Sequence, residues 1–139
     1  MKAMSKKIWR LCLMAVCCLM LTGCSGNKLA DCFSREELET QTQENIRLAE
    51  SGDYEAFMET VEPLTRSAFT EEVYDQYLEA VGAKGAFQKF GKTAFVGQTD
   101  KDTGANYAAV IILAEYENGK LQYTVGYNEQ MQIVQFLIK

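Results

Sequence analysis

The chain has 139 residues, with 14 basic and 19 acidic side chains and a formal net charge of −5. The sequence carries no basic footprint of the kind that binds nucleic acid. It contains no histidine, which excludes any catalytic pair or metal site that depends on an imidazole.

The first segment predicts a secretory signal peptide. Four basic residues precede an unbroken apolar run of eleven residues, Leu11 to Leu21. That run is too short for a membrane span of about 20 residues, and a small residue follows it, as at a cleavage site. The sequence Leu21-Thr22-Gly23-Cys24 resembles the bacterial lipoprotein box, in which the cysteine is diacylated and the chain is cut just before it.

We therefore expect residues 1–23 to be removed by cleavage between Gly23 and Cys24, and the Cys24 thiol to carry palmitate-type lipid. Two acyl chains, at roughly 0.8 kcal/mol per CH₂, anchor a protein stably. The predicted location is the extracytoplasmic face of the cell membrane. Loss of the four basic residues would change the formal charge from −5 to −9. An ordinary secreted protein with a cysteine near its cleavage site is the alternative.

The remaining 116 residues suit a tether, residues 24–32, and one domain, residues 33–139. Cys32 is the one other cysteine left after cleavage, so no internal disulfide is expected. Ser34 and Glu37 form the pattern of a capping box, which predicts a helix that runs to about Glu50. Its inward stripe by helical spacing comprises Leu38, Thr42, Asn45, Ile46 and Ala49. The two polar members lie either at the edge of the core or against a cavity.

Two further helices are predicted. Asp53 caps a helix with apolar residues at i, i+3, i+4 and i+7 that continues through Val61, and Pro63 closes or kinks it. Thr70 precedes a third helix, which Gly82 ends. Its stripe comprises Val73, Tyr74, Tyr77, Leu78 and Val81.

The second half of the chain predicts four strands. They cover residues 87–98, with a bend or bulge at Gly91, residues 106–117, a partner strand after Asn118-Gly119, and residues 131–139. A two-residue Asn-Gly turn pairs Glu117 with Lys120. This register places eight residues on one face: Val110, Ile112, Ala114, Tyr116, Leu121, Tyr123, Val125 and Tyr127. The expected fold is α+β, with three helices on one face of a four-stranded antiparallel meander.

The chain is similar to the bacterial domain of unknown function 3887. The segments that carry the similarity are Ser34 to Leu38, Gly52-Asp53-Tyr54, Leu64 and Thr70, Gly85-Ala86-Phe87, Tyr116 to Lys120, and Tyr123-x-Val125. It extends over about residues 33–139. That domain resembles the nuclear-transport-factor-2-like group, which implies a curved sheet that closes over the helices, often with a pocket and often with a homodimer through the outer sheet face. Ile111 and Leu113 on that face fit such a dimer.

The resemblance also implies two kinds of catalytic site, which the residues do not favour. A His–Asp pair is excluded because the chain has no histidine, and no carboxylic acid is clearly expected on the inward face. Glu115 and Glu117 are expected to point outward, while Glu62, Asp75 and Glu79 suit solvated positions better than buried ones. We predict no catalytic residue, no cofactor and no metal site. The stretch of residues 100–106 departs from a calcium loop in its glycine position and at Ile111, and we interpret it as a strand connection.

Seven tyrosines are the remaining feature. Those expected to point inward form either a core with satisfied hydroxyls or the lining of a small apolar pocket. The candidate pocket residues are Thr42, Asn45, Tyr77, Tyr116, Tyr123 and Tyr127. Our leading hypothesis is a membrane-tethered, non-enzymatic binding or interaction module, homodimeric through the outer sheet face, with a small-molecule ligand. An isomerase- or cyclase-like enzyme with an inward carboxylate is one alternative, and a structural partner in envelope assembly is another.

Overall fold

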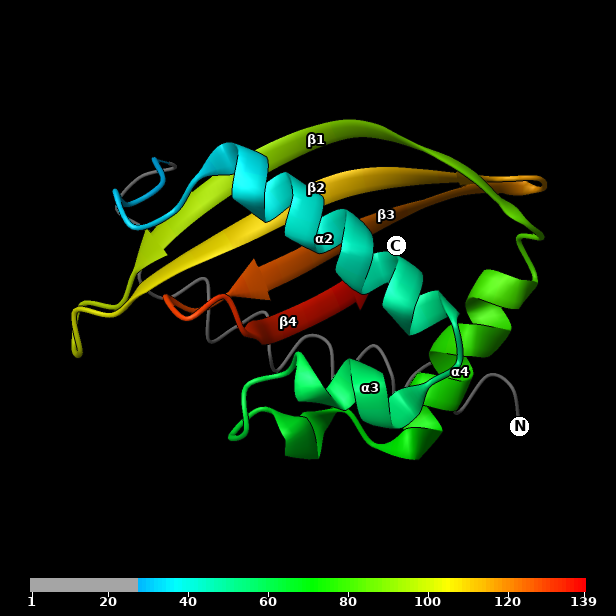
Figure 1. Ribbon diagram of the computed structural model, residues 1–139, viewed down its shortest axis with the longest axis horizontal. Coiled ribbons are helices and arrows are strands. Elements are labelled where there is room, and N and C mark those ends of the chain that lie inside the picture. Colours follow the sequence, from blue (N-terminus) through cyan, green and yellow to red (C-terminus); the bar gives the residue numbers. More distant parts are fainter. Residues whose placement is uncertain (1–27) are drawn as a thin grey trace.

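The computed structural model describes residues 28–139, in which helices come first and a sheet follows (Figure 1). The helices are α2 (Arg35–Glu50), α3 (Tyr54–Glu59) and α4 (Glu71–Gly82), with a short 3-10 turn, η1 (Arg66–Ala68), between the last two. The strands are β1 (Phe87–Thr99), β2 (Asn106–Tyr116), β3 (Gly119–Tyr127) and β4 (Ile133–Ile138). They form one antiparallel sheet in the order β1-β2-β3-β4. The fold is therefore α+β, as predicted.

Local side-chain chemistry sets where each helix begins. Ser34 caps α2 by accepting a hydrogen bond from the Glu37 amide, Asp53 caps α3 through the Ala56 amide, and Thr70 caps α4 through the Val73 amide. The caps at Ser34 and Asp53 confirm predictions, and the third helix begins directly after Thr70, as predicted. Within residues 28–139, none of the helices is long and apolar enough to span a bilayer.

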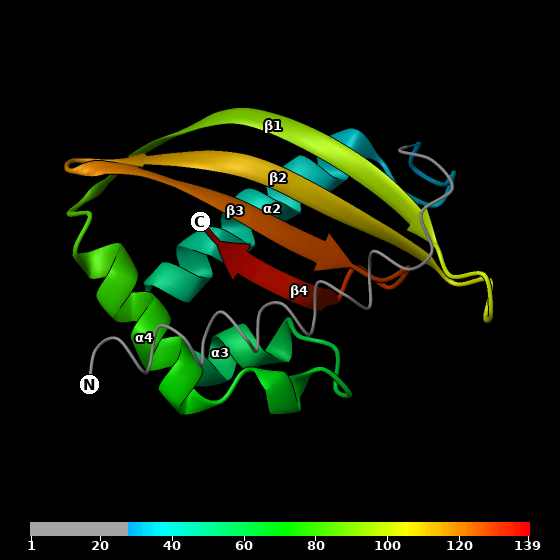
Figure 2. The same ribbon diagram turned by 180° about the vertical axis from the view of Figure 1, so that it is seen from behind.

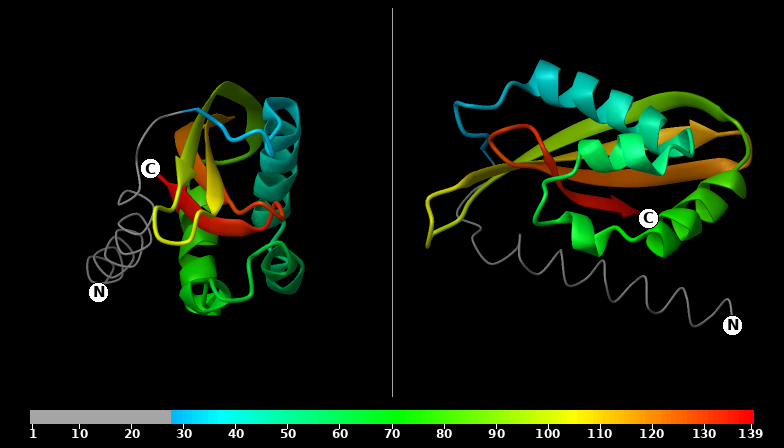
Figure 3. Two further views of the ribbon diagram at one scale, coloured as in Figure 1. Left: turned by 90° about the vertical axis from the view of Figure 1, so that its left-hand side faces the viewer. Right: turned by 60° about the horizontal axis from the view of Figure 1, so that its bottom comes forward.

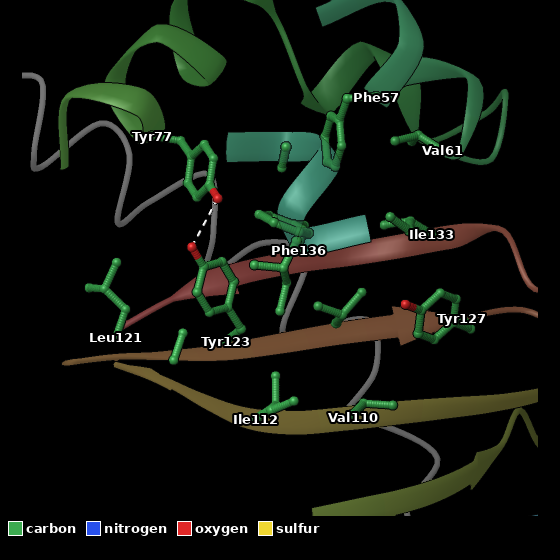
Figure 4. Packing of buried hydrophobic residues seen from close by; sticks show 14 of the residues in the cluster. Phe57, Val61, Tyr77, Val110, Ile112, Leu121, Tyr123, Tyr127, Ile133 and Phe136 are labelled. Carbon is green, nitrogen blue, oxygen red and sulfur yellow. Dashed lines mark hydrogen bonds between the residues drawn. The ribbon is translucent and has the colours of Figure 1, made fainter. Parts of the chain in front are cut away.

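Helix α2 crosses the sheet, while α3 and α4 close the core on the side of β4 (Figures 1 and 3). The buried side chains of α2 are Leu38, Thr42, Asn45, Ile46 and Ala49, which is the predicted stripe. In the core, Phe57 of α3 and Tyr77 of α4 pack edge-on against Phe136 of β4, with ring centroids 5.1 and 5.4 Å apart (Figure 4).

The second helix is shorter than predicted. It ends at Glu59, and Val61 forms a parallel bridge with Ile133 instead of a further helical turn. The Glu62 amide donates to the Ile133 carbonyl at 2.9 Å, and the Ile133 amide donates to Thr60 at 2.8 Å. Val61 is fully buried, as predicted for a member of the apolar stripe. It reaches the core from an extended segment beside β4 and not from a helix.

The β2–β3 turn corrects the predicted register. Tyr116 pairs with Gly119 and Glu115 with Lys120, so the turn residues are Glu117 and Asn118. The stretch before β1 fixes this turn, because the Asn118 amide donates to Lys84 at 2.8 Å and the Glu117 amide donates to Ala86 at 3.0 Å. A shift of two residues leaves side-chain direction unchanged. The eight residues predicted to share a face are accordingly all buried.

Strand β1 agrees with the expectation at Gly91, whereas the start of β4 differs from it. The predicted irregularity at Gly91 is present, since the β1–β2 register shifts between Phe90 and Thr93. Strand β4 begins at Ile133, later than predicted, because residues 128–132 form a loop around Asn128. The Asn128 side-chain oxygen accepts from the amides of Gln130 and Gln132.

Candidate functional site

The six residues predicted to line a pocket are all buried between α2, α4 and the sheet. They separate into two groups along β3. Thr42 and Asn45 meet Tyr127, which we call the Tyr127 cluster, and Tyr77 and Tyr116 meet Tyr123, which we call the Tyr123 cluster. Figure 4 shows Tyr123 and Tyr127 well apart on the same strand, with the Tyr77–Tyr123 hydrogen bond at one end.

The Tyr127 cluster explains the two polar residues on the inward stripe of α2. The Tyr127 hydroxyl lies 2.9 Å from Thr42 Oγ1 and accepts a hydrogen bond from Asn45 Nδ2 at 3.1 Å. Asn45 Oδ1 in turn accepts from Gln41 Nε2 at 3.1 Å. Thr42 and Tyr127 are fully buried and Asn45 is 2 % exposed. The polar stripe of α2 therefore serves a buried phenol on β3.

The Tyr123 cluster is a chain of hydroxyls that ends on a carboxylate. Tyr116 donates to Glu50 Oε2 at the end of α2. The Tyr116 and Tyr123 oxygens are 2.7 Å apart, and the Tyr123 and Tyr77 oxygens are 2.9 Å apart. Because the Tyr116 proton points to Glu50, Tyr123 must donate to Tyr116 and Tyr77 to Tyr123. Each of the three phenol protons is thus used within the cluster.

Burial dominates the electrostatics of both clusters. It raises the pKa of Tyr77, Tyr116 and Tyr123 well above the usual 10.0, and the hydrogen bond to Glu50 raises that of Tyr116 further. Burial also raises the pKa of Tyr127 to about 12, against the opposing effect of the Thr42 and Asn45 hydrogen bonds. All four phenols are therefore neutral donors at physiological pH.

Glu50 is the site residue that sequence reasoning missed. Its side chain is 10 % exposed and pairs with Arg47 at 2.6 Å, while the Arg47 guanidinium lies 4.1 Å from the centroid of the Phe87 ring. The available signal was its spacing, since Glu50 follows Ile46 by four residues and so lies on the same helix face. The prediction ended the stripe at Ala49 instead.

The other carboxylates considered as catalytic candidates lie elsewhere. Asp75 and Glu79 are exposed on α4, and half-buried Glu62 accepts from the Thr65 hydroxyl at 2.7 Å. Glu115 lies on the outer sheet face, 4.0 Å from the ammonium nitrogens of Lys89 and Lys120.

Residues 100–105 connect β1 to β2, as predicted. Asp100 Oδ1 accepts from the Asp102 and Thr103 amides, and Gly104 adopts a φ of +75°. Such a backbone favours glycine. Across residues 28–139, no group of three or more Cys, Asp or Glu side chains is arranged to hold a metal ion.

A surface hollow of about 530 Å³ lies at the opposite end of the sheet from the Tyr123 cluster. Residues 28–32 line it together with Asn106 and Glu129. It includes Cys32, whose thiol is free and exposed. The predicted cleavage residues Gly23 and Cys24 lie outside the described residues.

Comparisons with known proteins identify relatives but no activity. The model of a family described as "Protein of unknown function (DUF3887)" matches residues 42–136. The chain is also similar to a solved structure described as "NMR structure of protein from Ruminococcus gnavus ATCC 29149", with 35% identity and a TM-score of 0.73. That similarity covers 81% of this chain and 96% of the other. No curated protein is significantly similar to the present chain.

Proposed function

The chain belongs to the DUF3887 family, and we propose that this member is a lipid-anchored, extracytoplasmic binding or interaction module rather than an enzyme. The observation that supports this proposal most is the use of the buried hydroxyls. Tyr127 joins α2 to β3, Tyr77 joins α4 to β3, and Tyr74 donates to the Ala49 carbonyl at 2.5 Å and so joins α4 to α2. These groups hold helices to one another and to the sheet, which makes the interior a rigid support for an external surface.

The lipid anchor is the part of the proposal that can be tested most directly. The full chain would be expressed in a bacterial host and its mass measured after extraction from membranes. We expect loss of residues 1–23 and addition of a diacylglyceryl group at Cys24. Cys24→Ser should abolish the modification, while Cys32→Ser, the matched cysteine control, should retain it. An unmodified protein released into the medium would refute the anchor.

The fold group and the oligomeric state also belong to the proposal. A curved four-stranded sheet over helices is compatible with the nuclear-transport-factor-2-like group, in which the outer face pairs two copies. In this chain Ile111 and Leu113 of β2 point to that face, beside the Glu115 carboxylate and its two lysines. Ile111→Asp should convert a dimer to a monomer in native mass spectrometry, whereas a monomeric wild-type chain would contradict the pairing.

The same spectrum tests for a ligand. A small apolar molecule retained by the protein would appear as additional mass on the intact chain. Such an adduct supports the binding module and supplies the ligand for identification. A dimer without an adduct favours the structural role in envelope assembly.

Glu50 favours a second candidate, an isomerase-like enzyme. A carboxylate that is 10 % exposed and hydrogen-bonded to a buried tyrosine resembles the acid–phenol pairs that stabilise developing negative charge. Against this role, each phenol proton of the Tyr123 cluster already has an acceptor. Deuterium exchange at the carbon next to a ketone, measured with wild-type and Glu50→Gln protein, would test it. Wild-type exchange that the variant loses would support the enzyme.

A further inference from the structure

The segment before α2 is part of the fold from Lys28 onward. Gly97 of β1 allows its backbone to approach, because a Cβ atom at Gly97 would collide with the Lys28 carbonyl and would lie 2.8 Å from Leu29 Cα. Leu29 and Ala30 pack against the core, and the Phe33 amide donates to the Ala30 carbonyl at 3.0 Å. The chain is thus held against the sheet well before the first helix begins.

This attachment fixes the distance between the domain and the proposed lipid. Only residues 25–27 separate Cys24 from Lys28. Four residue steps of at most about 3.5 Å give a reach of about 14 Å. A tether that remained free as far as Ser34 would reach more than twice as far, so the contact at Gly97 determines how closely the domain is held.

The attachment also determines which end of the domain is held. Residues 28–32 lie beside Asn106 and Glu129, next to the β1–β2 and β3–β4 loops, as Figure 1 shows. The turn at Glu117 and Asn118 lies at the other end of β2 (Figures 1 and 2). An eleven-residue strand is about 35 Å long, so the two ends differ greatly in height above a membrane.

We propose that the end formed by loops 100–105 and 128–132 faces the lipid surface, and that the Glu117–Asn118 end is displayed away from it. This inference rests on the lipid anchor proposed above. The charged residues at the held end are Lys28, Asp31, Asp100, Lys101, Asp102 and Glu129. Their net negative charge gives no attraction to anionic lipid, so the short docked tether, and not adsorption, sets the orientation.

The experiment compares two fluorescent labels on the full lipidated chain. Lys101→Cys and Asn118→Cys, each combined with Cys32→Ser, place an exposed thiol at either end of the sheet. The labelled proteins are added to preformed phosphatidylcholine vesicles that carry a nitroxide on the lipid headgroup. We expect the label at position 101 to lose most of its fluorescence and the label at position 118 to lose little.

Two variants test the role of the docked segment. A Gly-Ser insertion of about twelve residues between Asn27 and Lys28 adds a flexible span of about 19 Å. Gly97→Ala should release the segment itself, and the insertion tests the same point without altering the sheet. Both variants should reduce quenching at position 101, so that the extent of quenching differs less between positions 101 and 118.

The outcomes separate the two proposals. Intact mass is measured first on every sample. A chain without lipid overturns the anchor and this orientation together. A lipidated chain whose two labels are quenched equally, or whose label at position 118 is quenched more, overturns the orientation and leaves the anchor standing.

Discussion

Tyr127→Phe is the sharpest test of the view that buried hydroxyls hold α2 to the sheet. The ring is fully buried and would stay in place, so the change removes one oxygen and creates little space. That oxygen is hydrogen-bonded to Thr42 Oγ1 at 2.9 Å and to Asn45 Nδ2 at 3.1 Å. Each net hydrogen bond contributes about 1 kcal/mol, and a buried amide left without an acceptor adds to the loss. We expect the free energy of unfolding to fall by about 2–3 kcal/mol.

Equilibrium urea unfolding, followed by circular dichroism, measures this change. Tyr107→Phe is the matched control. Ala108 pairs with Tyr127, so its neighbour Tyr107 points to the opposite sheet face, where it is half-buried. Loss of the Tyr107 hydroxyl should change the free energy of unfolding by less than about 0.5 kcal/mol. A double-mutant cycle with Thr42→Val isolates one partner, and we expect a coupling energy of about 1 kcal/mol between positions 42 and 127. A Tyr127→Phe variant as stable as Tyr107→Phe, with no coupling, would refute the reasoning.

Three further predictions follow from the same structure. The pKa of Tyr127 is raised to about 12, so above pH 10 the unfolded chain loses a proton that the folded chain keeps. Tyr127 alone should therefore lower the free energy of unfolding by roughly 2 kcal/mol between pH 10 and pH 12, in addition to the loss from the other buried tyrosines, and Tyr127→Phe should remove that part of the slope in urea titrations at each pH. Glu50→Ala should cost about 2 kcal/mol because Tyr116 loses a charged acceptor, whereas Glu50→Gln, which keeps an acceptor, should cost less; equal losses would contradict this. Gly85→Ala should lower the melting temperature, since φ is +81° there and the new Cβ would lie 3.0 Å from the side-chain nitrogen (Nδ2) of Asn118. Gly82→Ala, at an open helical position, should leave the melting temperature unchanged or raise it.

Features set by neighbouring residues could be predicted from the sequence. The caps at Ser34 and Asp53 depend on a side chain and an amide three residues away. The inward stripe of α2 and the eight-residue face of β2 and β3 depend only on helical and strand periodicity. These predictions are confirmed because nothing distant competes with them.

Features set by distant residues could not be predicted. The Asn-Gly pair favoured a turn at 118–119, but hydrogen bonds from residues 84–86 hold the turn one residue earlier. Val61 leaves its helix because Ile133 offers a backbone partner from 72 residues further along the chain. The candidate site shows the same division, because helical spacing places Glu50 on the inward face of α2, but its contact with Tyr116 arises only when α2 packs on the sheet.

The bulge near Gly91 has a consequence for proteins crowded on one surface. An open sheet has two edges whose free amides and carbonyls can recruit a strand from a neighbouring molecule and start aggregation. The bulge interrupts the long edge strand β1, which also carries the exposed lysines Lys89 and Lys92. The Val61–Ile133 bridge shields part of the β4 edge. Molecules held side by side by the proposed lipid anchor would therefore pair less readily through these two edges.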